Sequence, residues 1–193
     1  MNMVQVYIKG QEDKELSSFL RYYPVRIKNI GMDAFFDRQV IYDFKDGRNH
    51  ADVAKCVAKM LVKKFGRKVR SVVFSCVPAS NQERNEARNK NFSELVCKFS
   101  GAINGFSHVK VVGERTAVHG TKVKKDEREK RLKEKNNIEV DANFFKNKIV
   151  CIWDDVVTTG TSFCAYTAQL EQVGAHVTNG IFLGKTSYKY VQQ

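Results

Sequence analysis

The chain has 193 residues, of which 42% are hydrophobic and 28% charged, and its formal net charge at pH 7 is +12. No apolar run approaches the roughly 20 residues that a membrane-spanning helix needs. The first eight residues also lack the basic region and apolar core of a signal peptide. We therefore expect a single domain over residues 1–193, located in the cytoplasm, with no membrane partner.

The N-terminal 40 residues carry no recognisable motif, and we treat 1–40 as a variable region ahead of a core at 41–187. Residues 2–8 alternate weakly between apolar and polar and are compatible with a strand. Five aromatic side chains of the variable region are candidates either for core packing, which we favour, or for stacking on a bound base. They are Phe19, Tyr22, Tyr23, Phe35 and Phe36.

The first part of the core is predicted to run from a short element to a buried strand. Ile41–His50 is expected to be a short element that ends in a turn at Asp46–Gly47. Apolar residues at helical spacing predict a helix from about 49 to 65, which Gly66 ends. The β-branched run 69–77 predicts a buried strand that Pro78 ends.

The second part of the core continues the alternation of strands and helices. A helix is predicted over 92–99, with Leu95, Val96 and Phe99 as its apolar face. A second helix is predicted over 160–173, ended by Gly174. Further strands are predicted at 109–112, 149–153 and 177–183. This order predicts an α/β fold with an open, mostly parallel sheet and helices on both faces.

Residues 115–143 contain no clear strand pattern, and 122–135 is highly charged and nearly devoid of apolar residues. One interpretation is a solvated helix with ion pairs between residues four apart. The other is a mobile hood over a functional site, because long loops inside compact domains are usually functional or disordered.

The segment 149–162 carries the most specific pattern in the chain. An apolar run leads to Asp154 and Asp155, and the hydroxyl- and glycine-rich turn 158–162 follows, before a predicted helix. Backbone N–H groups and hydroxyls in such a turn, at a helix N-terminus, suit a phosphate. The two carboxylates would repel that phosphate, but they suit the sugar hydroxyls of the same ligand.

Other interpretations of these residues fit less well. A simple helix cap needs one hydroxyl and no acidic pair. Residues 180–186 resemble the end of a phosphate-binding P-loop, but their glycines are one residue too close and no helix is predicted after them. The five cysteines form no C-x-x-C pair and lie in apolar stretches, which indicates buried thiols in place of a metal site or disulfides.

Segment Ile149–Ser162 resembles the phosphoribosyl pyrophosphate (PRPP) motif of type I phosphoribosyltransferases, and every position of that motif is filled. The resemblance implies that Asp154 and Asp155 hold the ribose 2′- and 3′-hydroxyls and act as the catalytic pair. It also implies that the hydroxyl loop binds the 5′-phosphate. The loop residues are Thr158, Thr159, Gly160, Thr161 and Ser162.

The same resemblance assigns the groups that would hold pyrophosphate. The loop after the first core strand would do so mainly through backbone amides, and a basic hood loop would add cations. The pyrophosphate loop would comprise Pro78, Ala79, Ser80 and Asn81, and the hood contacts would be Arg115, Lys122 and Lys124. Mg²⁺ is the implied cofactor, held through substrate and water with no direct protein ligands.

Several features outside the PRPP motif resemble the ComF-like branch of the family, among them Pro78 followed by Arg84, Arg88 and Phe92. The chain departs from that branch in lacking its zinc ribbon. It also has Asn89 where a glycine is usual, and His119 in place of a glutamine. His119 is open to two interpretations, a pyrophosphate or proton-transfer role and a plain surface histidine.

The resemblance implies an enzyme that transfers the phosphoribosyl group of PRPP to an unidentified nitrogen acceptor, a nucleobase by expectation. A non-catalytic sensor of PRPP or nucleotides, or a ComF-like accessory of DNA uptake, remains the alternative. The surplus of positive charge predicts weak, non-specific nucleic-acid binding at low salt only. A homodimer is one of the assemblies that the sequence leaves open.

Overall fold

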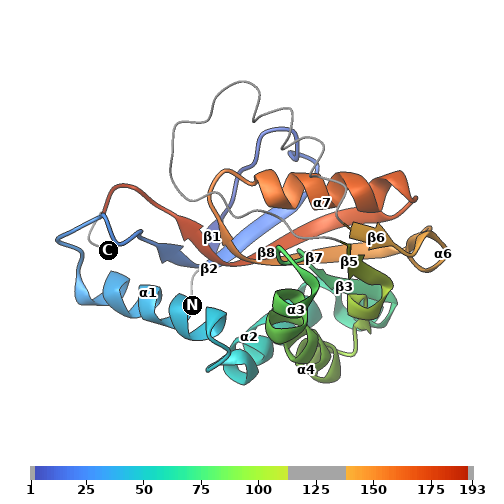
Figure 1. Ribbon diagram of the computed structural model, residues 1–193, viewed down its shortest axis with the longest axis horizontal. Helices are drawn as coiled ribbons and strands as arrows, with labels where there is room; N and C mark the ends of the chain where they lie inside the picture. The colour runs from blue at the N-terminus through green and yellow to red at the C-terminus, as the bar shows by residue number, and fades with distance from the viewer. Residues whose placement is uncertain (1–2, 113–137, 191–193) are drawn as a thin grey trace.

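The computed structural model describes residues 3–112 and 138–190 and shows a mixed α/β fold around a six-stranded sheet of order β1-β2-β8-β7-β3-β4 (Figure 1). Only the β1–β2 pair is antiparallel. The predicted open, mostly parallel sheet is confirmed. Its strands are β1 (Val4–Gln5), β2 (Glu15–Tyr22), β8 (His176–Thr186), β7 (Ile149–Val157), β3 (Val72–Cys76) and β4 (Ile103–Asn104).

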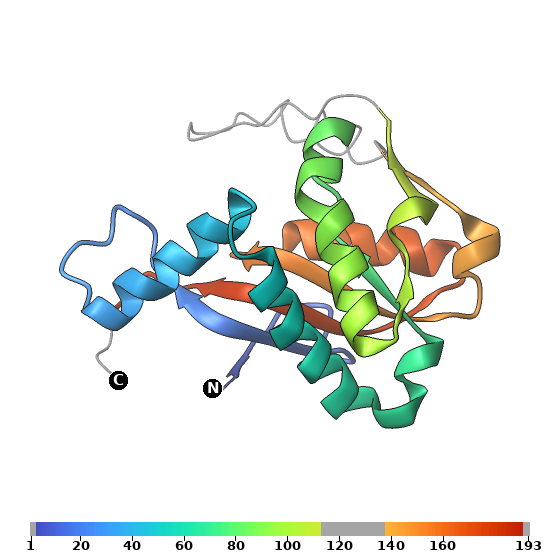
Figure 2. The ribbon, with the colours of Figure 1, turned by 90° about the horizontal axis from the view of Figure 1, so that it is seen from below.

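Helices cover both faces of this sheet, as predicted. Helix α7 (Thr161–Gln172) lies on one face, and α1 (Met32–Lys45) and α2 (His50–Phe65) lie on the other (Figures 1 and 2). The second face also carries a helix over residues 82–100. It consists of α3 (Gln82–Asn85), a π-helical turn (Glu86–Lys90) and α4 (Asn91–Ser100).

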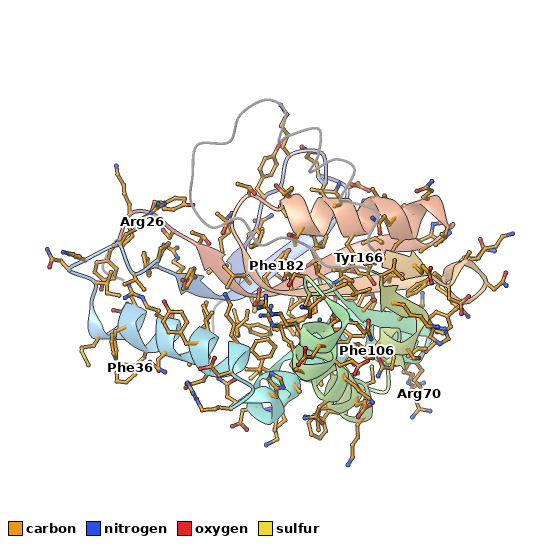
Figure 3. All side chains as sticks on the ribbon, viewed as in Figure 1. Arg26, Phe36, Arg70, Phe106, Tyr166 and Phe182 are labelled. Atoms are coloured by element: carbon orange, nitrogen blue, oxygen red, sulfur yellow. The ribbon has the colours of Figure 1, made fainter. Side chains whose placement is uncertain are left out.

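The hydrophobic core has two layers, one on each side of the sheet. Alternation along β7 sends Trp153 into the layer under α1, α2 and α4, and Ile152 into the layer under α7. On the α7 side, Tyr166 and Phe182 lie between the helix and the sheet (Figure 3). Because both faces of the central strands are buried, these strands appear in the sequence as continuous apolar runs.

The N-terminal 40 residues contribute a full strand and most of a helix to this core. Strand β2 pairs in parallel with β8, and Phe19 and Tyr23 are buried, as the core-packing interpretation requires. Phe35 and Phe36 do not pack in the core, since 49% and 58% of their surfaces are exposed. The element expected at 41–50 is the C-terminal part of the longer helix α1, and it ends in a turn at Asp46–Gly47 as predicted.

Several other local predictions need correction. The expected strand at 69–77 is shorter, because residues 66–71 form a 3-10 helix before β3. Phe99 does not belong to the buried face of α4; it is 42% exposed, whereas Phe92 and Val96 are fully buried.

A small separate sheet lies outside the six-stranded one. Strand β5 (Val109–Val111), expected in the main sheet, pairs in antiparallel fashion with β6 (Ile138–Val140), where no strand was expected. The short helix α6 (Ala142–Phe145) then leads into β7. Within the described ranges, no helix is both long and apolar enough to cross a bilayer.

Candidate functional site

The candidate site lies at the carboxyl ends of β3, β7 and β8, the edge where open α/β sheets commonly bind ligands. Strand β7 continues through the acidic pair to Val157, so both aspartates are held by the sheet and not by a loop. Side chains alternate along a strand, so the two aspartates start from opposite faces of β7, but both reach the second hollow at the end of the strand. Asp154 lies beside the hydroxyl loop and α7, and Asp155 contacts residues from α1 and the π-helical turn.

The predicted phosphate loop wraps a small hollow of about 150 Å³ between β7 and the start of α7. The hollow is lined by Asp154 and by 156–163, which include all five predicted loop residues. Gly160 precedes the helix with φ 84°, and a Cβ there would lie 2.7 Å from the Ile8 side chain. Glycine is therefore required twice, by the backbone conformation and by the close approach of Ile8.

The last residues of β8, which carry no predicted role at the site, anchor the hydroxyl loop. Thr186 Oγ1 lies 2.8 Å from Thr158 Oγ1, and Lys185 Nζ donates to the Thr158 carbonyl at 2.9 Å. Burial lowers the pKa of the Lys185 ammonium. In the sequence these residues belong to the Gly-Lys-Thr run at 184–186, which matches a P-loop poorly but does indicate a polar end of the strand.

A second hollow of about 260 Å³ adjoins the first and shares Asp154, Val156 and Ser162 with it. Its remaining lining residues are Val77, Pro78, Ala79, Ser80, Arg84, Arg88 and Asp155. The structure thus brings three of the four predicted pyrophosphate-loop residues next to the acidic pair. Asn81 has a different contact, in which its side chain accepts from Arg84 N at 2.9 Å and caps α3.

Two buried asparagines hold the loop at 77–80 in place. Asn85 Oδ1 accepts from Ala79 N at 3.1 Å and from Asn89 Nδ2 at 2.9 Å, and Asn89 Nδ2 also donates to the Val77 carbonyl at 3.2 Å. Both asparagines come from the α3 and π-helical segment of the 82–100 helix. Asn89, which stands where the ComF-like pattern has a glycine, therefore helps to hold the loop in place.

The two carboxylates of the acidic pair have different electrostatic environments. Burial, followed by the neighbouring Asp155 charge, raises the pKa of the Asp154 carboxyl well above its usual range. Asp155 lies among cations, with Arg88 Nη1 at 3.2 Å and Lys45 Nζ at 3.8 Å from its Oδ2 atom. Asp154 therefore holds its proton to higher pH than an ordinary carboxyl, whereas Asp155 is ion-paired with Arg88 and Lys45.

The residues present suit a Mg²⁺ ion that also binds substrate phosphate. Among residues 3–112 and 138–190, no group of three or more His, Cys, Asp or Glu side chains forms a metal cage. A pair of carboxylates beside a phosphate-sized hollow is a typical donor set for Mg²⁺, which keeps several water ligands and binds substrate oxygens. Asp154 and Asp155 would lie beside such an ion and contact it through its water ligands and the substrate oxygens, with no direct protein ligand.

The predicted hood contacts Arg115, Lys122 and Lys124 lie outside the described residues, as does His119. The basic groups that the structure places at the second hollow are Arg84 and Arg88. Both come from the helix that follows the 77–80 loop.

Comparison with known proteins gives limited information. No family model matches the chain, and no curated protein matches it. A matching solved structure is that of the allosteric regulatory enzyme of purine biosynthesis, at 17% identity and a TM-score of 0.40. The match covers 69% of this chain and 25% of that one, so this chain spans about a quarter of its length. At this TM-score the match establishes neither a family nor a function, and it does not show the ComF-like branch.

Proposed function

We propose that this protein binds PRPP together with Mg²⁺ and transfers its phosphoribosyl group to a nitrogen acceptor, with release of pyrophosphate. One observation carries the proposal. Two adjoining hollows share Asp154, Val156 and Ser162, one being lined by a hydroxyl loop at a helix N-terminus and the other by a loop and two arginines. A ligand with a phosphate at one end, a sugar diol in the middle and a pyrophosphate at the other matches this order of groups.

Each part of the site has a task in that reaction. The 5′-phosphate would bind in the first hollow through the N–H groups and hydroxyls of 158–162, assisted by the positive end of the α7 dipole. Asp154 and Asp155 would accept hydrogen bonds from the ribose hydroxyls and fix the sugar between the two hollows. The Asp155 carboxylate also favours positive charge that develops on the sugar ring as the bond to pyrophosphate breaks.

The departing pyrophosphate would occupy the second hollow, against the 77–80 loop. Its charge is matched there by Arg84 and Arg88, and Mg²⁺ supplies further charge neutralisation when it is bound. The bond between ribose C1 and the pyrophosphate oxygen breaks, with its electron pair leaving on pyrophosphate, and a bond between C1 and the acceptor nitrogen forms as that nitrogen gives up its proton to solvent. The chain itself forms no covalent intermediate. Its contribution is orientation and electrostatics.

Within this class, we further propose that the protein belongs to the ComF-like branch. The support is sequence-based: Pro78 is followed by Arg84, Arg88 and Phe92 at that branch's spacing. Pro78, Arg84 and Arg88 line the second hollow, and Phe92 is fully buried in the core.

The proposal is tested by incubating the protein with PRPP, Mg²⁺ and a panel of nucleobases and other nitrogen nucleophiles, and assaying pyrophosphate release. We expect release to depend on one acceptor class and to be lost in the Asp154→Asn, Asp155→Asn double variant. Calorimetry should show strongly weakened PRPP binding in that variant, while its circular dichroism spectrum stays unchanged. Equal PRPP affinity of wild type and double variant would sink the assignment.

A non-catalytic sensor of PRPP or nucleotides gives a different result in the same experiment. It binds PRPP with dependence on Asp154 and Asp155, but it releases no pyrophosphate with any acceptor. That outcome would overturn the transferase assignment, but PRPP would remain the ligand of the site.

A further inference from the structure

Arg88 occupies the place where the two parts of the proposed ligand meet. Its guanidinium lines the second hollow together with Ser80 and Arg84, and its Nη1 atom lies 3.2 Å from Asp155 Oδ2. The two side chains are well covered, with 35% of the Arg88 and 12% of the Asp155 side chain exposed. An ion pair in this position is screened less than one on the open surface.

The backbone around Arg88 is held by contacts of its own. Arg88 lies in the π-helical turn Glu86–Lys90, and single π-helical turns inside α-helices frequently mark functional sites. Asn85 and Asn89 of the same segment are buried and hydrogen-bonded to the 77–79 loop. The helix therefore fixes the starting point of the Arg88 side chain relative to both the loop and Asp155.

Asp155 already has a partner on each carboxylate oxygen. Oδ1 accepts from Val156 N at 2.7 Å, and Oδ2 faces Arg88 and, at 3.8 Å, Lys45. A sugar hydroxyl that approaches this carboxylate has to compete with these groups. The strongest competitor is the Arg88 guanidinium, since Lys45 is farther away.

We propose that Arg88 couples recognition of pyrophosphate to recognition of ribose: a pyrophosphate in the second hollow draws the guanidinium away from Asp155 and frees that carboxylate for the sugar hydroxyls. This inference rests on the proposed function and deepens it. A guanidinium binds phosphate oxygens in a bidentate way, so the anion replaces the contact that Arg88 loses. A sugar phosphate without pyrophosphate offers Arg88 no new partner, so its hydroxyls must break the Arg88–Asp155 ion pair without compensation.

Arg88 is then a specificity-determining residue that favours PRPP over ribose 5-phosphate. A ligand can shift the Arg88–Asp155 pair only by its differential affinity for the paired and open states. PRPP has that differential affinity through its pyrophosphate, and ribose 5-phosphate lacks it. Removing the guanidinium should therefore act on the two ligands in opposite directions.

The test is titration calorimetry of Arg88→Gln with PRPP and, separately, with ribose 5-phosphate, both in the presence of Mg²⁺. We expect PRPP affinity to fall roughly ten- to hundredfold, the size of a lost charge-assisted hydrogen bond. We expect ribose 5-phosphate to bind roughly two- to fivefold more tightly, because no partly exposed ion pair remains to be broken. The preference for PRPP should collapse.

Three variants serve as controls. Lys90→Gln removes the same charge from an exposed position of the same turn and should change neither affinity by more than about twofold. Arg84→Gln, which lines the hollow but forms no ion pair within the described residues, should weaken PRPP and leave ribose 5-phosphate unchanged. If Arg88→Gln does not fold, Arg88→Met carries the test, since it removes the charge and keeps an unbranched side chain; we expect the same opposite shifts in the affinities for PRPP and ribose 5-phosphate.

The outcomes separate the inference from the proposal on which it rests. If wild-type protein binds no PRPP, the proposed function falls and the inference falls with it. If wild type binds PRPP but Arg88→Gln weakens both ligands, or leaves ribose 5-phosphate unchanged, the coupling role is overturned and the PRPP site stands.

Discussion

Asp154 and Asp155 are neighbours in sequence and chemically alike, yet their surroundings in the fold differ. The alternation of β7 turns Asp154 toward the layer under α7 and Asp155 toward Arg88 and Lys45. Burial and the adjacent negative charge raise the pKa of the Asp154 carboxyl. An acidic pair that looks symmetrical in the sequence therefore consists of one group that favours its proton and one that is ion-paired.

This asymmetry predicts how stability depends on pH. The pKa of Asp154 is raised in the folded state, so its stabilising contribution is complete below the ordinary carboxyl pKa of 3.8 and is lost as pH rises through the raised value. Asp154→Asn keeps the oxygen that accepts from Asp155 N and removes the ionisation. Relative to wild type, the variant should gain melting temperature progressively from pH 4 toward neutrality.

The measurement is thermal unfolding of both proteins, followed by circular dichroism across that pH series. A difference in melting temperature that is the same at every pH would show that Asp154 does not titrate abnormally in the folded protein.

At the scale of elements, the hydroxyl loop depends on the segment between β1 and β2. Ile8 comes from that segment and packs directly on Gly160, where an added Cβ would approach to 2.7 Å. The phosphate loop is thus supported from the N-terminal region, whose sequence carries no motif. A pattern search along 149–162 finds the loop but not the residue that covers it.

Gly160→Ala should destabilise the protein and weaken the phosphate loop. The alanine must adopt φ 84° and displace Ile8, whereas Gly10→Ala must adopt φ 80° with no atom within 4 Å. We expect Gly10→Ala to cost about 1 kcal/mol for the backbone alone, and Gly160→Ala about 1–3 kcal/mol more for overpacking. Urea unfolding of both variants measures the difference, and equal costs would refute the packing argument.

The helix over 82–100 is the second element whose detail matters for the site. Its π-helical turn and the two buried asparagines were not predicted, because helical spacing in the sequence gives the apolar face of α4 but not a local change of winding. Asn85 receives the Ala79 N–H, so the pyrophosphate loop depends on this helix for its shape.

Asn85→Ala should leave the Ala79 N–H without its partner and Asn89 with one contact fewer. We expect a loss of about 1–3 kcal/mol in the free energy of unfolding, together with weaker PRPP binding. Asn91→Ala, at an exposed position of the same helix, should stay within about 0.5 kcal/mol of wild type. Denaturant unfolding and calorimetry check both effects; an Asn85 variant as stable as the Asn91 variant would argue against the role of this contact.

For the whole molecule, the net charge of +12 is a property that the described site explains only in small part. Arg84, Arg88, Lys45 and Lys185 account for a small part of it at the site. The hood residues Arg115, Lys122 and Lys124 lie outside the described part of the chain, so their assigned role stays a prediction. The surplus of charge still has a measurable consequence for polyanions.

We expect the protein to bind duplex DNA at low salt through counterion release, with at least about a hundredfold loss of affinity between 50 and 200 mM salt. Affinity should not depend on base sequence, because no groove-reading motif accompanies the charge. Fluorescence anisotropy with two unrelated duplexes of equal length measures both properties. DNA binding that persists at physiological salt, with no detectable PRPP binding, would favour the nucleic-acid alternative.

The sequence by itself determined helices α2, α4 and α7 and strands β3, β7 and β8, the mostly parallel character of the sheet, and the segment 149–162 as the candidate phosphate site. These are local properties: hydrophobic periodicity, glycine positions and a contiguous motif are readable within a few residues. The tertiary structure alone decided that β2 and α1 complete the core, that Ile8 covers Gly160, and that Arg88 and Lys45 meet Asp155. These contacts join residues dozens to more than a hundred positions apart, and only the packing of the sheet and its helices brings such residues together.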